Sequence, residues 1–484
     1  MIPPSRRLVA ALTALLLAAS SLPAQDNALP PLTLEQCIAR ALSRNFDLEI
    51  SRYAPQIAKD SIDVAKGGYE PQLSVSGSRG GSNSDISGVS SNGSDLRVGV
   101  TQQLYTGTLV SASSQLGRTS TNPALTLNPA YDADLTLSVR QPLLRGAGFA
   151  ANRALIERAE IGFQRANLDY KARVLDIIQA TENAYYNLAY AREQLAVQNF
   201  SLSLAQKLFD EAKTRRDTGV ATDLDVLQAE VGVANARRGV ILAEQSMKDR
   251  QDALLALIGQ FELDAPLGAV RFQEAEGALP VFASSYQLAK QNQPDYLSSQ
   301  AAIDQFKLDL TLAKDAAKPD LSVGAAVGLS GRNGSGNDAF NDAFDRQGHS
   351  WQVDFAFNYP WGRKADKARE RQSLAALNRE QTRLRLIEQD IEVQVRSAVR
   401  SVEANTESVK IAALASGLSQ KQYELEKAKF DAGLSTSRRV LEAQDDLETA
   451  RVSELQARVA LSNAISALHR LEGSSLQRYA VELP

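Results

Sequence analysis

The sequence predicts an internally duplicated α+β membrane protein that combines long antiparallel helices with short amphipathic strands. Residues 47–75 match residues 295–323 at a constant offset of 248, and both blocks end in Pro-x-Leu-Ser-Val. A second block recurs at an offset of 214, in which Gly219 and Thr222 return as Gly433 and Thr436. Each half is therefore expected to run helix, strands, very long helix, glycine turn and returning helix.

The first 24 residues are expected to be a secretory signal. Arg6 and Arg7 precede an apolar run from Leu8 to Ala19, and residues 20–24 are suited to cleavage. The run is shorter than the about 20 residues of a membrane span, although an uncleaved anchor is the alternative. Removing the two arginines changes the formal charge from -4 to -6, which leaves no basic surface for nucleic acid.

Cys37 is the only cysteine, so an intramolecular disulfide is excluded. It lies beyond the signal, within a helical pattern, which argues against a lipid-anchored N-terminal cysteine. We expect it to be a small buried apolar residue.

Two long stretches contain no proline, from Leu143 to Ala265 and from Trp361 to Leu483. Since proline breaks helix interiors, these stretches can hold long helices, and apolar residues recur along them at three- and four-residue steps. The helices expected at 152–217 and 362–430 would each be roughly 100 Å long. A globular domain of this size cannot contain them, so they should project as a tube or stalk.

Each long helix is followed by a glycine turn. Gly219 and Gly433 are expected to adopt the left-handed cap conformation, and Thr222 and Thr436 to cap the returning helices. An ordinary helical hairpin needs nothing more. The functional interpretation adds that both turns lie at the same far tip.

The expected strands alternate apolar with polar or small residues over about ten positions, at about 320–330, 350–359 and 131–139. Outer-membrane barrel strands have this pattern, although a half-buried strand of a soluble sheet has the same period. Trp351, Tyr359 and Trp361 lie near strand ends, where an aromatic girdle at the membrane surface would be.

The halves differ between residues 77 and 130, where the first is about 30 residues longer. The excess contains an expected hairpin at about 95–117, which is either external or an additional pair of barrel strands. Residues 80–93 and 331–348 are rich in Gly, Ser and Asn, as exposed loops are.

No catalytic or metal-binding pattern is present. His349 and His469 are the only histidines, and HExxH, paired Cys/His spacing, phosphate loops and G-x-S-x-G are absent from the sequence. The carboxylates lie among Lys and Arg at helical spacing, as on solvated helices. We therefore expect no enzyme, no cofactor and no metal.

Taken together, the opening Leu-Thr-Leu-Glu at 32–35, the two Pro-x-Leu-Ser-Val blocks and the two glycine turns resemble the TolC-like outer-membrane efflux channels. The resemblance spans nearly the whole mature chain. It implies a homotrimer in which each subunit gives four strands to a 12-stranded transmembrane β-barrel and four helical columns to an α-helical barrel, the periplasmic tunnel. One chain alone would leave sheet edges exposed to lipid, which trimerisation removes.

The expected organisation follows from this. A signal peptide at 1–24 precedes a first repeat at 25–258, an equatorial segment at 259–293, a second repeat at 294–472 and a tail at 473–484. The first repeat holds helices within 33–70, strands within 71–141 and long helices at 152–217 and 222–258. The second holds a helix at 294–318, strands at about 320–330 and 350–359, and long helices at 362–430 and 436–472.

The resemblance also implies a gate, because acidic side chains after the second tip turn narrow the periplasmic entrance in that family. The matching positions are Arg439 and Glu442, so only one of them keeps the acid. Asp225, after the first turn, is the next candidate. A solvated helix face is the alternative for each of these charges.

The implied function is a duct that exports small molecules or proteins, as in efflux or type I secretion. Its partners would be a periplasmic adaptor docking at the tip turns, an inner-membrane pump of the RND, ABC or MFS class, and outer-membrane lipid. The alternative is a soluble periplasmic coiled-coil adaptor or scaffold without a pore.

Overall fold

The computed structural model describes residues 31–84, 88–122, 127–259, 261, 267–270, 272, 279–345, 348–359 and 361–481. The predicted signal peptide lies outside them, as does part of the predicted equatorial segment. The chain forms two compact units. The helix–turn unit comprises the described residues of Met1–Asn45, Ile177–Leu279 and Arg400–Ala467, and the sheet unit those of Phe46–Asp176, Pro280–Val399 and Leu468–Pro484.

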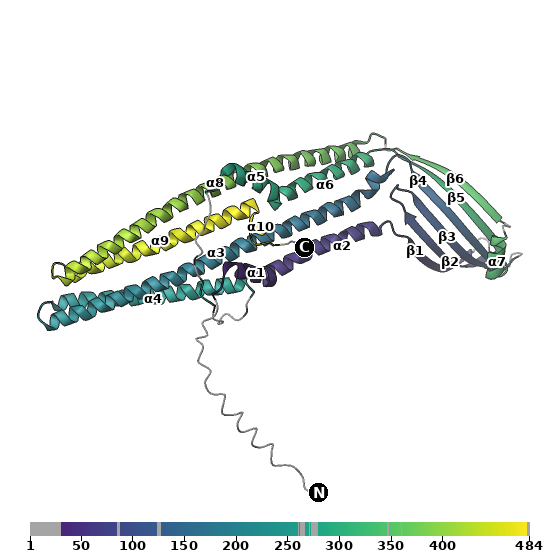
Figure 1. The fold of residues 1–484 in the computed structure, drawn as a ribbon. Helices are drawn as coiled ribbons and strands as arrows, with labels where there is room; N and C mark the ends of the chain where they lie inside the picture. The colour runs from purple at the N-terminus through teal and green to yellow at the C-terminus, as the bar shows by residue number, and fades with distance from the viewer. Residues whose placement is uncertain are drawn as a thin grey trace, which may run out of the picture. The chain divides into compact units, whose positions relative to one another are not determined.

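Both halves of the chain contain a long helix, a turn and a returning helix (Figure 1). In the described residues no helix has both the length and the apolar character needed to cross a membrane. The helices are α1 Leu34–Arg44, α2 Phe46–Gly67, α3 Phe149–Asp217, α4 Asp223–Leu257, α5 Phe282–Asn292, α6 Pro294–Ala316, α7 Gly336–Phe344, α8 Lys364–Asp431, α9 Ser437–Glu472 and α10 Ser475–Arg478. The strands are β1 Gln72–Ser84, β2 Val89–Gln103, β3 Leu109–Asn122, β4 Ala130–Pro142, β5 Asp320–Asn333 and β6 Gly348–Asn358.

The helix–turn unit buries its largest apolar side chains where α1 meets α3 and α4. Cys37 is 0% exposed, as the sequence predicts for a small apolar residue. The Tyr185 hydroxyl donates to the Leu32 carbonyl at 3.2 Å, and Asn45 Nδ2 donates to the Leu257 carbonyl at 2.9 Å. These two bonds fix the ends of α1 against the neighbouring helices.

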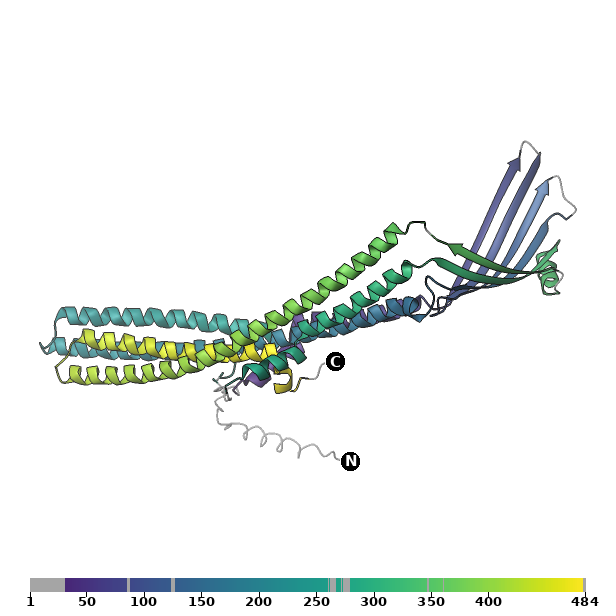
Figure 2. The same cartoon turned by 90° about the horizontal axis from the view of Figure 1, so that it is seen from above.

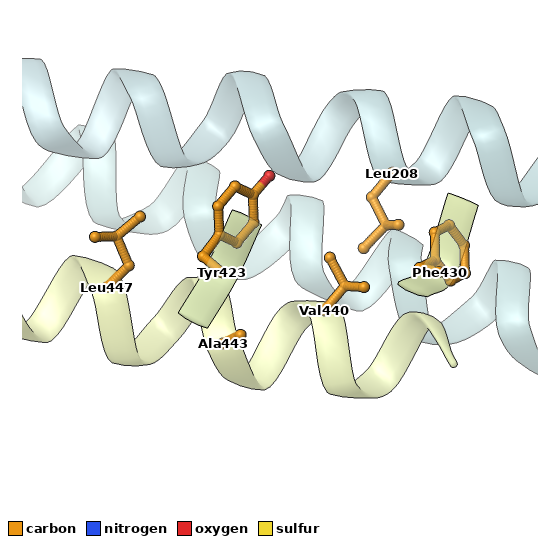
Figure 3. Packing of buried hydrophobic residues seen from close by; sticks show 6 residues of the cluster. All are labelled: Leu208, Tyr423, Phe430, Val440, Ala443 and Leu447. Carbon is orange, nitrogen blue, oxygen red and sulfur yellow. The ribbon is translucent and has the colours of Figure 1, made fainter. Parts of the chain in front are cut away.

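A second apolar cluster of this unit joins α3, α8 and α9 (Figure 3). Gln444 Nε2 of α9 donates to the Ser201 carbonyl of α3 at 3.0 Å, which satisfies a buried amide beside the cluster. The packing explains why long helices of modest intrinsic stability are held in place. The cluster consists of Leu208, Tyr423, Phe430, Val440, Ala443 and Leu447.

The sheet unit contains one six-stranded antiparallel sheet in the order β1-β2-β3-β4-β5-β6 (Figure 2). Helices α2, α3, α6 and α8 adjoin the sheet at one end of the strands, and helix α7 lies at the other. Arg173 of α3 pairs with Asp47 of α2 at 2.9 Å, and Arg158 of α3 with Asp309 of α6 at 3.3 Å.

The helices expected within 33–70 are α1 and α2, which are separated at Asn45 because this residue adopts an extended conformation (ψ 124°) and its side chain bonds to α4. Two other features differ from the sequence prediction. The inserted hairpin, expected at about 95–117, consists of β2 and β3 and lies within the sheet. The chain therefore gives six strands, whereas the resemblance to TolC-like channels implies four.

The second difference concerns residues 331–348, expected to be an exposed loop, which contain helix α7. The Ser335 side chain caps this helix by accepting from the Asp338 N–H at 3.2 Å. Ala339 and Ala343 are fully buried. Helix α7 can lie this close to β5 only because residue 331 is glycine. A Cβ atom at Gly331 would lie 2.1 Å from the Ala339 carbonyl oxygen. Short-range composition could not reveal this tertiary contact.

Candidate functional site: the helix tips and the polar sheet face

The two tip turns have the same backbone geometry. Gly219 and Gly433 have φ values of 78° and 75°, as the sequence predicts. The Val220 N–H donates to the Arg215 carbonyl at 2.8 Å, and the Leu434 N–H donates to the Lys429 carbonyl at 2.8 Å. These six-to-one bonds, with glycine in the left-handed region, define Schellman caps.

The helices that follow the turns begin at the predicted threonines. Thr222 caps α4 in a capping box: its hydroxyl accepts from the Asp225 N–H at 3.3 Å, and Asp225 Oδ2 accepts from the Thr222 N–H at 2.9 Å. The Thr222 N–H and the Thr222 hydroxyl, which donates to Asp225 Oδ2 at 2.7 Å, together lower the pKa of the Asp225 carboxyl. Thr436 directly precedes α9, and its carbonyl accepts from the Arg439 N–H at 3.1 Å.

Arg215 brings the two turns to the same end of the helix–turn unit. Its guanidinium lies 4.0 Å from the centre of the Phe430 ring and donates to the Phe430 carbonyl at 3.2 Å. Lys427 pairs with Glu211 at 3.4 Å one turn further along the same helices. Sequence reasoning did not single out Arg215, because a cation over an aromatic ring has no sequence spacing when the partners lie on different helices.

The predicted gate residues all lie in this region, and most have partners within the chain. Glu442 pairs with Arg438 at 2.9 Å. Asp223, which is 94% exposed, lies 3.9 Å from Arg216. Arg439 is exposed and faces Glu426, whose pKa is lowered chiefly by a hydrogen bond from Ser435 and by Lys429. Within one chain, Asp225 serves the cap of α4.

Two apolar side chains are exposed at the turns themselves. Val220 is 77% exposed and Leu434 is 79% exposed, and they occupy equivalent positions in the two halves. Single exposed apolar residues are common on protein surfaces, but these two recur at the same position of a duplicated turn. The offset of 214 that relates the glycines could have identified this pair in the sequence.

The two faces of the sheet differ in polarity along the half of the strands nearer the helices. The strand register places Leu73, Val100, Ala112, Leu137, Val327 and Trp351 in one row across all six strands. Side chains opposite one another point to the same face. Much of this apolar face is exposed in the single chain: Val327 is 55% exposed and Phe355 is 69% exposed.

The opposite face is polar, and its charged side chains pair across strands. Ser78 donates to Asp95 at 2.7 Å, and Arg332 pairs with Asp132 at 3.4 Å. Arg140 on β4 reaches Asp354 on β6, at 3.9 Å, across Gly324 of β5. A Cβ atom on Gly324 would lie 2.4 Å from an Asp354 oxygen, so the glycine leaves room for this pair.

The three predicted girdle aromatics lie on or beside β6. Trp351 is 77% exposed and lies on the apolar face of β6, while Tyr359 follows the strand and Trp361 is 98% exposed. Their side chains are thus open to the surroundings of the chain. The described residues hold no group of three or more His, Cys, Asp or Glu placed to bind a metal ion.

The combination of paired helix tips and a two-faced sheet is that of an outer-membrane channel. The family model "Outer membrane efflux protein" matches residues 37–260 and 285–474, and the chain belongs to this family. It is an outer-membrane protein and not an enzyme.

Similar sequences come from the same class of protein. The chain is 26% identical to the pyoverdine export outer membrane protein OpmQ of Pseudomonas putida, over 73% of this chain and 72% of that protein. It is 23% identical to the outer membrane protein TolC of Vibrio cholerae, over 72% of this chain and 83% of that protein.

Solved structures share the fold. The outer-membrane channel OprN matches with a TM-score of 0.69 at 18% identity, covering 91% of this chain and 89% of that one. The Campylobacter jejuni outer membrane channel CmeC matches with a TM-score of 0.69 at 16% identity, covering 96% and 95%.

Proposed function

We propose that three copies of this chain assemble into a continuous duct, with a closed β-barrel in the outer membrane and a closed helical tunnel in the periplasm. The observation that supports the proposal is that the β-sheet of the single chain has two unpaired edges. Strands β1 and β6 each have one unpaired edge in the sheet. Sheet edges facing lipid are costly, so β1 of one copy would pair with β6 of the next.

Exposed apolar stripes support the same assembly. On α2, which leads into edge strand β1, Ile50, Tyr53 and Ile57 are each more than half exposed. In the helix–turn unit, α4 and α8 carry similar stripes. Residues three and four apart share a helix face, so each stripe can pack on a helix of another copy. The stripes are Leu224, Leu227 and Val231 on α4, and Ile411, Leu414, Leu418 and Leu425 on α8.

The tip turns would be the docking surface for a periplasmic adaptor, which links the duct to an inner-membrane pump. Gly219 and Gly433 set the turn geometry, while Val220 and Leu434 supply exposed apolar contact. Export of small molecules is favoured over protein secretion, because the similar OpmQ is named for pyoverdine export. The polar sheet face would then line the lumen and the apolar face would contact lipid.

The resting gate would use charges at the tips. Arg439 would pair with Asp223 of a neighbouring copy, since Asp223 is 94% exposed while Asp225 is engaged in its cap. Glu442 would line the constriction as a ring of three. Each such exposed pair stabilises closure by only about 0.2–1 kcal/mol, but a trimer contains three of them.

Native mass spectrometry of detergent-extracted protein, followed by planar-bilayer recording, tests the proposal. The expected result is a trimer that resists dissociation in mild detergent and conducts ions. A stable, non-conducting monomer would overturn it.

A further inference from the structure

Strands β2 and β3 lie in the middle of the sheet and not at its edge. β2 pairs with β1 from Gln72↔Thr101 to Ser84↔Val89, and β3 pairs with β4 from Leu109↔Arg140 to Thr119↔Ala130. The hairpin therefore separates β1 from β4 along their whole lengths. An appended external hairpin would leave β1 and β4 adjacent.

In the half nearer the helices, the hairpin also continues the polarity of both faces. Val98 of β2 lies between Val75 of β1 and Ser114 of β3 on the apolar face. On the polar face one row contains Ser76, Arg97, Gln115, Asp134 and Ser330, and Arg97 Nε donates to Gln115 at 3.1 Å. A strand pair whose two faces match the polarity of its neighbours is expected in the wall of a transmembrane β-barrel.

We propose that β2 and β3 are wall strands of the assembled barrel, so that three chains with six strands each enclose an 18-stranded lumen. This inference rests on the proposed trimer. With strands about 4.8 Å apart and tilted by about 40°, opposite backbones would be about 36 Å apart, against about 24 Å for 12 strands. The lumen cross-section at the backbone would be about twofold larger.

A lumen of that width admits bulkier polar small molecules than a 12-stranded lumen does. The paired charges of the polar face suit such cargo, because Asp132–Arg332 and Arg140–Asp354 neutralise one another and leave a wall without a dominant sign. Selection by size and charge would then lie at the helical end of the duct.

Cysteine pairs test where the hairpin lies. Val75→Cys with Val98→Cys, and Ala112→Cys with Leu137→Cys, join directly opposed residues and should form disulfides in the membrane-assembled protein. The matched control is Val75→Cys with Leu135→Cys, which share a row but lie three strand spacings, about 14 Å, apart. It should stay reduced. A disulfide in the control pair, with none in the other two, would overturn the proposal.

Lumen width is tested by hairpin deletion. Replacing residues 85–129 by Asn-Gly should join β1 to β4 directly and leave a 12-stranded trimer. Polyethylene glycols of graded size, added in planar bilayers from the side of the strand connections, should enter the parent up to about 1.5 times the width that the deletion variant admits. An unchanged cut-off in a deletion variant that is trimeric by native mass spectrometry overturns this inference alone. A parent that is not trimeric overturns the proposed function instead.

Discussion

At the scale of single residues, the two tip glycines are constrained by their backbone conformation alone. Both have φ near 75–78°, and nothing lies within 4 Å of an added Cβ atom at either position. A substitution there meets no steric obstacle from neighbours, so its cost is purely that of the left-handed backbone, about 1–2 kcal/mol for a residue with a side chain.

Gly219→Val and Gly433→Val are therefore expected to distort the turns without unfolding the helices. The trimer should persist while cross-linking to the adaptor and drug resistance fall. Gly417→Val in α8 is the control, since Gly417 also has open space but lies inside a helix. Full adaptor cross-linking in both turn variants would contradict the docking assignment.

Cys37 offers a second test at this scale. Burial raises the pKa of its thiol to about 12, so at pH 8 the thiol is protonated as well as inaccessible. Maleimide should fail to label the native protein and should label it completely in guanidinium chloride. Labelling of the native protein at the rate of a free thiol would show that α1 opens readily.

The gate charges belong to the same scale. Arg439→Glu should repel Asp223 of a neighbouring copy and raise the resting conductance in planar bilayers. Glu442→Gln should leave closure unchanged but reduce cation preference and block by divalent cations, because a carboxylate ring concentrates cations. If Arg439→Glu channels stay as closed as the parent and Glu442→Gln keeps the parent's selectivity, the gate lies elsewhere.

At the scale of secondary-structure elements, the sequence predicted what depends on local patterns. The proline-free, periodic stretches predicted the long helices α3 and α8, and Thr222 predicted the start of α4. Both predictions succeeded because helix caps and apolar periodicity depend on residues a few positions apart. The position of the break between α1 and α2, at Asn45, was not predicted, and helix α7 was missed. Both depend on tertiary contacts, with the Leu257 carbonyl and with Gly331 respectively.

The register of the sheet shows the same limit. Alternation predicted which residues share a face, but it could not decide whether the inserted hairpin joins the sheet, since an external hairpin has the same period. The charge pair across Gly324 could not be predicted from the sequence either. Its partners, Arg140 and Asp354, are separated by 214 residues in sequence and by one intervening strand in space.

The exposed stripe on α2 gives a prediction for this scale. Ile57 is 65% exposed in the single chain, so Ile57→Glu should leave the helix intact while placing a charge in the interface with the next copy. The trimer fraction in native mass spectrometry should fall. Lys59→Glu, at an exposed position of the same helix, is the control and should assemble as the parent does. Equal assembly of both variants would show that α2 faces solvent in the duct.

At the scale of the whole molecule, assembly and duplication are linked. Two halves with the same turn, at Gly219 and Gly433, supply four helical segments to the helix–turn unit, and each half ends its strands on a long helix. The family model matches both halves, at residues 37–260 and 285–474. The sequence could predict the family because the repeats preserve their order. It could not supply the cargo, because a wide duct has few contacts with what it passes.

The inserted strands also obey a parity rule. β1 runs away from the helices, β2 returns, β3 leaves again and β4 returns to the start of α3. An insertion with an even number of strands leaves the start of α3 at the same end of the sheet as α2. An odd number would place it at the opposite end, which lies outside the cell in the proposed barrel. The circumference of the proposed barrel can thus change only by the addition or loss of whole hairpins, at the end of the sheet remote from the helices. In the proposed barrel, the width of the lumen could therefore change in steps of two strands per chain without any change in the helix–turn unit.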